Sequence, residues 1–168
     1  MKKLIMTKTK PFTKLQLITL VVLRVLIGWH LLYEGISKLL SPSWSAKGFL
    51  HESQWIMSGM ANWITSNDGV LKVVDFLNIW GLIAIGTGLI VGLCTRAAAI
   101  SGALLLLLYY LNNAPIIGIE YSIPAEGNYL LVSKTLIEAI SLVVLTVFPT
   151  GSIIGLDLLF ARYKEIKK

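Results

Sequence analysis

The chain has 168 residues, the size of a single domain, and a formal net charge of +6 at pH 7. Hydrophobic residues make up 55% of it and charged residues only 14%, with a mean hydropathy of +0.75. These values exceed what a soluble core needs, so they exclude an ordinary soluble protein and favour an integral membrane protein.

Four apolar segments follow one another along the chain, at about residues 15–40, 73–93, 97–111 and 129–148. A helix rises about 1.5 Å per residue, so about 20 residues cross the ~30 Å hydrocarbon layer of a bilayer. We therefore predict an all-α integral membrane protein. A single domain, residues 1–168, is expected to form a bundle of four transmembrane helices surrounded by membrane lipid.

The connections between these segments differ in length. Two long ones, 41–72 and 112–128, should lie on one side of the membrane, whereas the connection near residues 94–96 is short. Trp44, Trp55 and Trp63 lie among polar residues in the first long loop, which predicts a partly helical segment on the membrane surface. The second is rich in Pro and Gly and predicts an ordered cap. Small residues around the short connection predict tight packing of the second and third helices.

The basic residues are distributed unevenly. Ten of the 15 Lys and Arg residues precede the first apolar segment, lie in the short connection or follow the last segment. This is the positive-inside pattern of a four-pass protein. We expect both termini in the cytoplasm, the multi-pass chain in a bacterial or archaeal cytoplasmic membrane, and no nucleic-acid partner.

Ionisable residues interrupt the first and last apolar segments. Charge at the bilayer centre costs at least ~2.5–3.5 kcal/mol per residue, so such residues persist when they are paired or solvated inside a bundle. By the helical period, the four on the first segment share a sector of roughly 120°, about the width of one buried face. A functional site is the default hypothesis for these six residues: Arg24, His30, Glu34, Lys38, Lys134 and Glu138.

Depth divides these residues into two layers. Counting from Lys14 and from Asn128, Arg24 and Glu138 both lie ~15 Å deep, so we predict that they pair near the midplane. This pair either fixes helix register or belongs to the site. His30, Glu34 and Lys134 lie farther out, where titratable groups facing one pocket suit proton-coupled chemistry, and are the predicted catalytic residues.

Neighbouring polar residues leave alternatives open. Lys38 either joins this pocket or extends to the headgroups. Asp75 is a helix-start residue or a member of the site, and Asn78 lies beside it on the chain. Tyr109 and Tyr110 form an aromatic belt or clamp a ligand ring.

The sequence favours neither a metal nor a haem. Its two histidines, His30 and His51, fall on different predicted elements, and no His-x-x-x-His pair is present. Cys94 is the single cysteine, so an intramolecular disulfide is excluded. We expect Cys94 to be a plain interfacial thiol rather than a persulfide carrier, and its role stays open.

Several short motifs together resemble one family. The run from Arg24 to Gly35-Ile36-Ser37-Lys38-Leu39 resembles the first helix of DoxX/DoxD-like membrane proteins, and Gly92-Leu93-Cys94-Thr95-Arg96 looks like their inner turn. Three further runs resemble the DoxD branch of the family: Tyr109-Tyr110-Leu111, Glu126-Gly127-Asn128-Tyr129-Leu130 and Lys134-Thr135-Leu136-Ile137-Glu138.

The resemblance implies a four-helix bundle and, for the DoxD branch, a subunit of a thiosulfate:quinone oxidoreductase with a smaller DoxA-like partner. We therefore expect a redox subunit that binds a quinone among its helices near the outer leaflet. The alternative is a non-catalytic anchor or assembly subunit of a redox or stress-response complex. A homo-oligomer is left open. The residues expected to bind the quinone are Arg24, Asn78, Tyr109, Tyr110 and Glu138.

Overall fold

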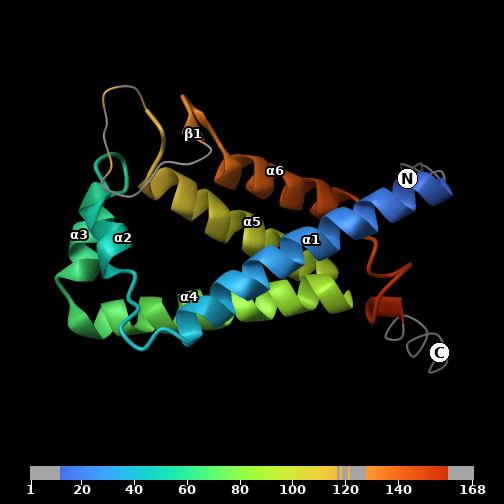
Figure 1. Cartoon of the computed structure of the whole chain (residues 1–168), viewed down its shortest axis with the longest axis horizontal. Helices are drawn as coiled ribbons and strands as arrows, with labels where there is room; N and C mark the ends of the chain where they lie inside the picture. Colours follow the sequence, from blue (N-terminus) through green and yellow to red (C-terminus); the bar gives the residue numbers. More distant parts are fainter. Residues whose placement is uncertain (1–11, 117, 119–120, 122–127, 159–168) are drawn as a thin grey trace, which may run out of the picture.

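The computed structural model describes residues 12–116, 118, 121 and 128–158. Its long helices are α1 (Lys14–Leu39), α4 (Asp68–Val91), α5 (Thr95–Asn112) and α6 (Lys134–Val147), which run along the long axis of the molecule (Figure 1). At one end lie the short elements: helices α2 (Lys47–His51) and α3 (Ser58–Thr65) and strands β1 (Asn128–Tyr129) and β2 (Val132–Ser133). We call this the loop end, and the opposite end, where α1 begins and α6 ends, the terminal end.

Local sequence sets the limits of α1. Thr13 and Gln16 form a capping box, in which each side chain accepts a hydrogen bond from the other residue's backbone N–H, at 3.3 and 3.0 Å. The helix ends at Leu39, shortly before Pro42, whose ring cannot continue a helix. The bounds differ by one residue at each end from the expected 15–40.

Packing is closest between α1 and α4. A Cβ atom added at Gly86 would lie 2.5 Å from the backbone N of Leu32, and one added at Gly35 would lie 2.7 Å from Cγ1 of Ile83. Only glycine allows the two helices to approach this closely. The predicted packing of α4 on α5 is present too, since a Cβ atom added at Gly88 would lie 3.4 Å from the Cβ of Ala98.

The last helix is shorter than its apolar segment. Residues 129–133, expected to be helical, form with Asn128 a two-stranded antiparallel hairpin in which Leu130 has a φ of 54°. Ser133 then caps α6 by accepting a hydrogen bond from the N–H of Leu136. Three helices, α1, α4 and α5, are long and apolar enough to cross a membrane by length and composition. At 14 residues, α6 falls short of that length.

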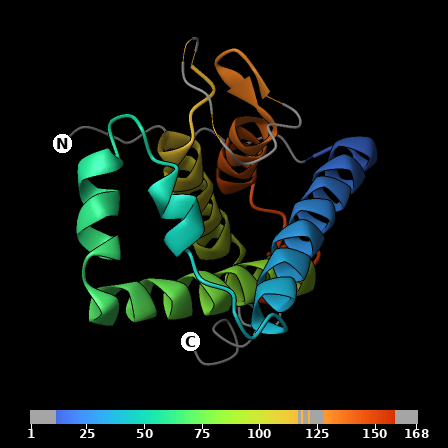
Figure 2. The ribbon, with the colours of Figure 1, turned by 60° about the vertical axis from the view of Figure 1, so that its left-hand side comes forward.

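The prediction that the segment 41–72 is partly helical is confirmed, since it contains α2 and α3. In Figures 1 and 2, α3 runs across the direction of α4 at the start of that helix. Most of the second outer loop, predicted to be an ordered cap, lies outside the described residues, as do the basic runs at both termini. The core between the four long helices is built mainly of leucines, including Leu31, Leu82, Leu89, Leu142 and Leu145.

Candidate functional site

An acid–base pair joins α1 to α6 toward the loop end. His30 Nδ1 lies 2.6 Å from Glu138 Oε1, and the His30 side chain is 46% exposed whereas that of Glu138 is only 15% exposed. The predicted pairing of Glu138 with Arg24 is therefore wrong. The depth estimate counted from Asn128, but α6 begins only at Lys134, so Glu138 lies in its second turn, level with His30.

Arg24 lies nearer the terminal end and is 2% exposed. Its two terminal nitrogens donate to Thr150 Oγ1 at 3.1 Å and to the carbonyl oxygen of Ile154 at 2.9 Å. Both acceptors belong to the turn that follows α6. Arg24 was expected among the quinone-binding residues, but the structure does not bring it to the loop end.

A chain of polar contacts crosses the bundle at the loop end. On α1, Lys38 Nζ lies 3.6 Å from Glu34 Oε2 and donates to Asn78 Oδ1 on α4 at 3.2 Å. Asn78 Nδ2 in turn donates to the hydroxyl of Tyr109 on α5 at 2.6 Å. Glu34, Asn78 and Tyr109 are therefore brought together, and Lys38 points inward to join them instead of extending to the headgroups. We call these four residues and the His30–Glu138 pair the loop-end cluster.

Aromatic rings surround the Lys38 ammonium. Its nitrogen lies 5.1 Å from the ring centroid of Trp44 and 5.3 Å from that of Tyr109, within the range of cation–π contacts. The ring of Phe49 meets Tyr109 edge to face, with centroids 5.6 Å apart. Sequence reasoning missed Trp44 and Phe49, because nothing local indicates that 44–49 folds back over α1 and α5. The position of Lys38 on the same helical face as Glu34 was the available signal for its role.

Two cavities adjoin this cluster and share Glu34, Lys38 and Tyr109. The larger, of ≈ 340 Å³, reaches the range of small-molecule sites, about 300–1,000 Å³. The smaller, of ≈ 160 Å³, is large enough for several waters. The larger is also lined by Trp44, Ser45, Ala46, Phe49 and Asn78. Additional residues line the smaller one: His30, Leu31, Leu82, Leu106, Lys134, Thr135 and Glu138.

Lys134 and Tyr110 have different surroundings. Lys134, at the start of α6, lines the smaller cavity with His30 and Glu34, so the three predicted catalytic residues are brought to one place. The hydroxyl of Tyr110 donates to the carbonyl oxygen of Leu131 in the hairpin at 2.7 Å. Tyr110 lines neither of the two cavities.

A comparison with known protein families shows to which family the chain belongs. A family model described as DoxX matches residues 19–111, which is more than half of the chain. The chain belongs to the DoxX family. No match was found among the curated proteins or the solved structures.

The DoxX match covers most of α1, all of α4 and nearly all of α5. His30, Glu34, Lys38, Asn78 and Tyr109 lie inside it, whereas α6, with its contribution to the smaller cavity, lies beyond it. With three helices that can span a bilayer, this DoxX protein is a multi-pass membrane protein. Among the residues that the structure describes, no group of three or more His, Cys, Asp or Glu residues could hold a metal ion. That neither metal nor haem takes part stays a prediction.

The turn that holds Arg24 also caps α5. Cys94, the N-cap residue, has a φ of 48° and no side-chain capping bond of its own. Instead, Asp157 Oδ1 accepts the N–H of Cys94 at 2.7 Å, and Oδ2 accepts the N–H of Thr95 at 3.0 Å as well as the Thr95 hydroxyl. Gly92 makes room for the turn, since a Cβ there would lie 2.7 Å from the Cα of Gly155. We call residues 150–157 the C-terminal clasp.

The charge of Asp157 suits this capping role. Burial acts to raise the pKa of its carboxyl, but the hydrogen bonds from Thr95 and Cys94 outweigh burial and hold the pKa below its ordinary value. The positive charge of Arg24 acts in the same direction. Asp157 is therefore ionised at neutral pH, as a cap on the positive end of the α5 dipole should be.

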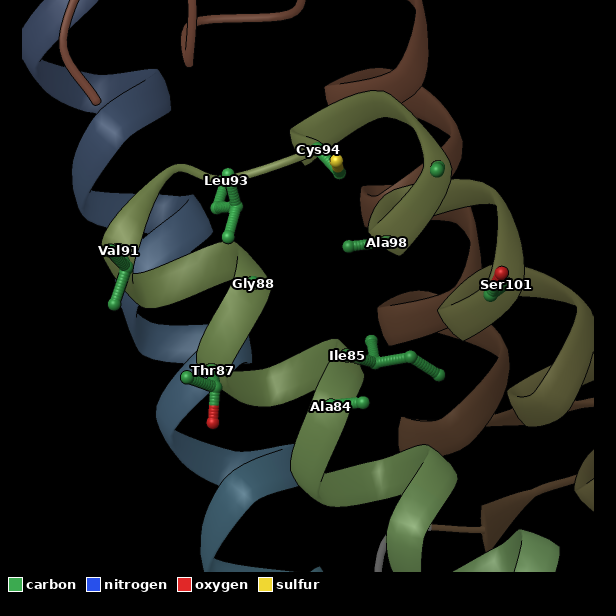
Figure 3. A pocket seen from close by; sticks show the side chains of 10 residues that line it. Ala84, Ile85, Thr87, Gly88, Val91, Leu93, Cys94, Ala98 and Ser101 are labelled. Atoms are coloured by element: carbon green, nitrogen blue, oxygen red, sulfur yellow. The ribbon is translucent and has the colours of Figure 1, made fainter. Parts of the chain in front are cut away.

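A third cavity, of ≈ 510 Å³, opens between α4 and α5 toward the terminal end (Figure 3). Ile85 and Leu93 on the α4 side and Ala98 and Ser101 on α5 line it, and Cys94 lies at the connection between the two helices. Its lining is almost entirely apolar and contains no acidic or basic side chain. The loop-end cluster is accordingly the better candidate for chemistry.

Proposed function

We propose that this DoxX protein is a redox subunit of a bacterial or archaeal cytoplasmic membrane that binds a quinone head group at its loop end. The observation that carries this proposal is the pair of adjoining cavities that share Glu34, Lys38 and Tyr109, with the His30–Glu138 pair in the wall of one of them. In this topology α1, α4, α5 and α6 all cross the membrane, the termini are cytoplasmic and the loop end faces outward.

Two features support four crossings. The helix α6 packs extensively along α5, and its 14 residues span about 21 Å. Ser133 before α6 and residues 148–151 after it extend its path at both ends. Non-helical backbone is tolerated at membrane depth where protein covers it, and Ser133, Thr150 and Gly151 are all buried.

The larger cavity fits a flat ring that carries carbonyl groups. Trp44, Phe49 and Tyr109 offer aromatic surface for such a ring. The Lys38 ammonium has three N–H donors, and Asn78 and Glu34 engage two of them. The Tyr109 hydroxyl accepts from Asn78, and among the described residues nothing accepts its own proton. Lys38 and Tyr109 thus each retain a donor that can bind a carbonyl oxygen.

The smaller cavity supplies groups that exchange protons. A bound quinone provides two-electron chemistry, and its reduction takes up two protons. Histidine gains and loses a proton readily near neutral pH, and His30 is hydrogen-bonded to Glu138 while Glu34 lines the same cavity. These residues are placed to hold protons and deliver them toward the neighbouring cavity. The ammonium group of Lys134 lines the same cavity.

We further propose thiosulfate as the electron donor and a smaller DoxA-like subunit as the partner that completes the enzyme. The resemblance to the DoxD branch supports this assignment. Its run from Lys134 to Glu138 forms the start of α6 and places both of these residues at the smaller cavity.

Replacement of Lys38 tests the proposed site. Lys38→Met keeps the length of the side chain and removes its charge and donors, so we expect the Kd of a short-chain quinone to rise about tenfold or more. Titration calorimetry of the purified protein in detergent measures the change. Lys72→Met, an exposed lysine on α4, is the matched control and should leave the Kd unchanged. Equal affinities of wild type and Lys38→Met would contradict the site.

A second candidate function, a non-catalytic anchor, is favoured by one observation. The most extensive helix contacts are those of α1 with α4 and of α5 with α6. The contacts of α4 with α5 and of α1 with α6 are less extensive. The His30–Glu138 and Asn78–Tyr109 bonds tie these two helix pairs together. In an anchor, neutralising these residues would lower the yield of folded protein, and the wild type would bind no quinone.

A further inference from the structure

Two polar side chains from different helices hold the backbone of residues 44–49. From α4, Asp75 Oδ1 accepts a hydrogen bond from the N–H of Ala46 at 2.8 Å. From the last residue of α5, Asn112 Nδ2 donates to the carbonyl oxygen of Phe49 at 2.8 Å. Asn112 is 2% exposed and Ala46 is 5% exposed, so both bonds are sheltered from water. The segment is thus pinned at two points, three residues apart.

The pinned segment carries the aromatic side of the larger cavity. Trp44, Ser45, Ala46 and Phe49 all line it. The ring of Trp44 lies over the Lys38 ammonium and that of Phe49 packs on Tyr109. Neither Asp75 nor Asn112 lines this cavity, so each acts on it only through the backbone that it holds.

We infer that residues 44–49 form a roof over the quinone cavity and that Asp75 and Asn112 are its positioning residues. The inference rests on the proposed function for the identity of the ligand. When the roof is held down, Trp44 and Phe49 complete the ring-binding surface above Lys38 and Tyr109. When either pin is removed, the roof lifts and the cavity loses that surface, although Lys38 and Tyr109 stay in place on their helices.

The positions of the two residues favour this role over a purely local one. Asp75 lies seven residues into α4, beyond the first turn, so it does not serve that helix as a cap. Asn112 Nδ2 donates to the distant Phe49 carbonyl as well as to Oδ1 of its neighbour Asn113, while its own buried Oδ1 has no partner among the described residues. An unpaired buried acceptor destabilises the fold, and the hydrogen bonds that Asn112 donates offset this loss of stability.

The single cysteine of the chain makes the roof directly measurable. Cys94→Ser removes the one native thiol, and Ser45→Cys then places a reporter inside the roof. The probe is a membrane-impermeant maleimide applied to the full chain in detergent or proteoliposomes, and the readout is the labelling rate. Because the measurement needs no quinone, it is independent of the proposed function.

We expect Asp75→Ala and Asn112→Ala each to raise this labelling rate about tenfold, the effect of losing one buried hydrogen bond on the opening equilibrium. Asp75→Asn keeps an acceptor oxygen and should restore slow labelling. The matched control is Asp68→Ala, which removes a carboxylate from the first turn of the same helix and should leave the rate unchanged. An unchanged rate in Asp75→Ala, or an equal rise in Asp68→Ala, would overturn the inference.

Quinone binding separates this inference from the function on which it rests. If the wild type binds quinone, Asp75→Ala should weaken binding about tenfold and Asp75→Asn should restore it. Fast labelling of Asp75→Ala with unaltered quinone affinity would overturn the role of the roof in the site. A wild type that binds no quinone would overturn the proposed function, and the labelling rates would still decide whether Asp75 and Asn112 hold the segment.

Discussion

His30 and Lys38 lie about two helical turns apart on α1 and have different neighbours. His30 is hydrogen-bonded to a carboxylate on α6, whereas Lys38 contacts an amide on α4 and the rings of Trp44 and Tyr109. His30 is thus suited to proton exchange, and Lys38 to binding a carbonyl oxygen. In the proposed site, replacing His30 should therefore affect turnover more than affinity, and replacing Lys38 should affect affinity directly.

This difference predicts the kinetics of His30 variants. In the complete enzyme, His30→Ala should lower kcat for quinone reduction about 100-fold, the lower end of what a general acid–base group contributes. Lys134→Ala should lower kcat less, since it acts through charge. Steady-state assays with a soluble quinone measure both. His51→Ala, which changes the exposed histidine of α2, is the control. Unchanged turnover in both His30→Ala and Lys134→Ala would remove these residues from the mechanism.

The composition of the site could largely be predicted from sequence, but its pairing could not. Helical spacing placed His30, Glu34 and Lys38 on one face of α1, and all three line the smaller cavity. The partner of Glu138 depended on where α6 begins, and the hairpin before Ser133 moved that start by five residues from the expected position. Such a shift changes depth by about 7 Å, enough to exchange one partner for another.

At the scale of elements, α5 illustrates how a distant segment can complete a helix. Its N-cap residue, Cys94, offers no side-chain capping bond, and Asp157 supplies the acceptors from 63 residues farther along the chain. Nothing near Cys94 in the sequence indicates this contact. By contrast, Thr13 and Gln16 lie three residues apart, so the start of α1 is readable from a local motif.

The capping role predicts a loss of stability in Asp157→Asn. Asparagine keeps one acceptor oxygen, but it loses the charge and replaces the other oxygen with an NH2 group that cannot accept a hydrogen bond. The change should cost about 1–2 kcal/mol, or a fall in Tm of several degrees, measured by thermal unfolding in detergent. Because the pKa of Asp157 is lowered in the folded state, its stabilising effect is complete above the ordinary carboxyl pKa of about 4 and is lost as pH falls through the lowered value. Wild type and variant should therefore differ at pH 7 and converge in strong acid.

The matched control for this change is Asp68→Asn in the first turn of α4, where no side-chain capping bond is present. It should lower Tm less than Asp157→Asn does. Equal stability of Asp157→Asn and wild type at pH 7 would show that the clasp does not depend on this carboxylate.

At the scale of the whole molecule, two tightly packed helix pairs are joined by a shared apolar core and by polar bonds. The α1–α4 pair is held by glycine contacts and the α5–α6 pair by apolar packing, with the loop-end cluster between the pairs. Hydropathy predicted a helical membrane protein with four long segments, and three of the helices reach spanning length. It could not predict the roof or the clasp, because both depend on loop segments whose contacts are with distant helices.

We expect the ligand to remain with the protein during purification, since the roof and side chains from α1, α4 and α5 all line the cavity. The most direct test of the central claim is mass spectrometry of quinones extracted from the protein purified in mild detergent. We expect stoichiometric quinone with the wild type and with Lys72→Met, and a marked loss with Lys38→Met. A wild type that carries no quinone and binds none when it is added would contradict the account.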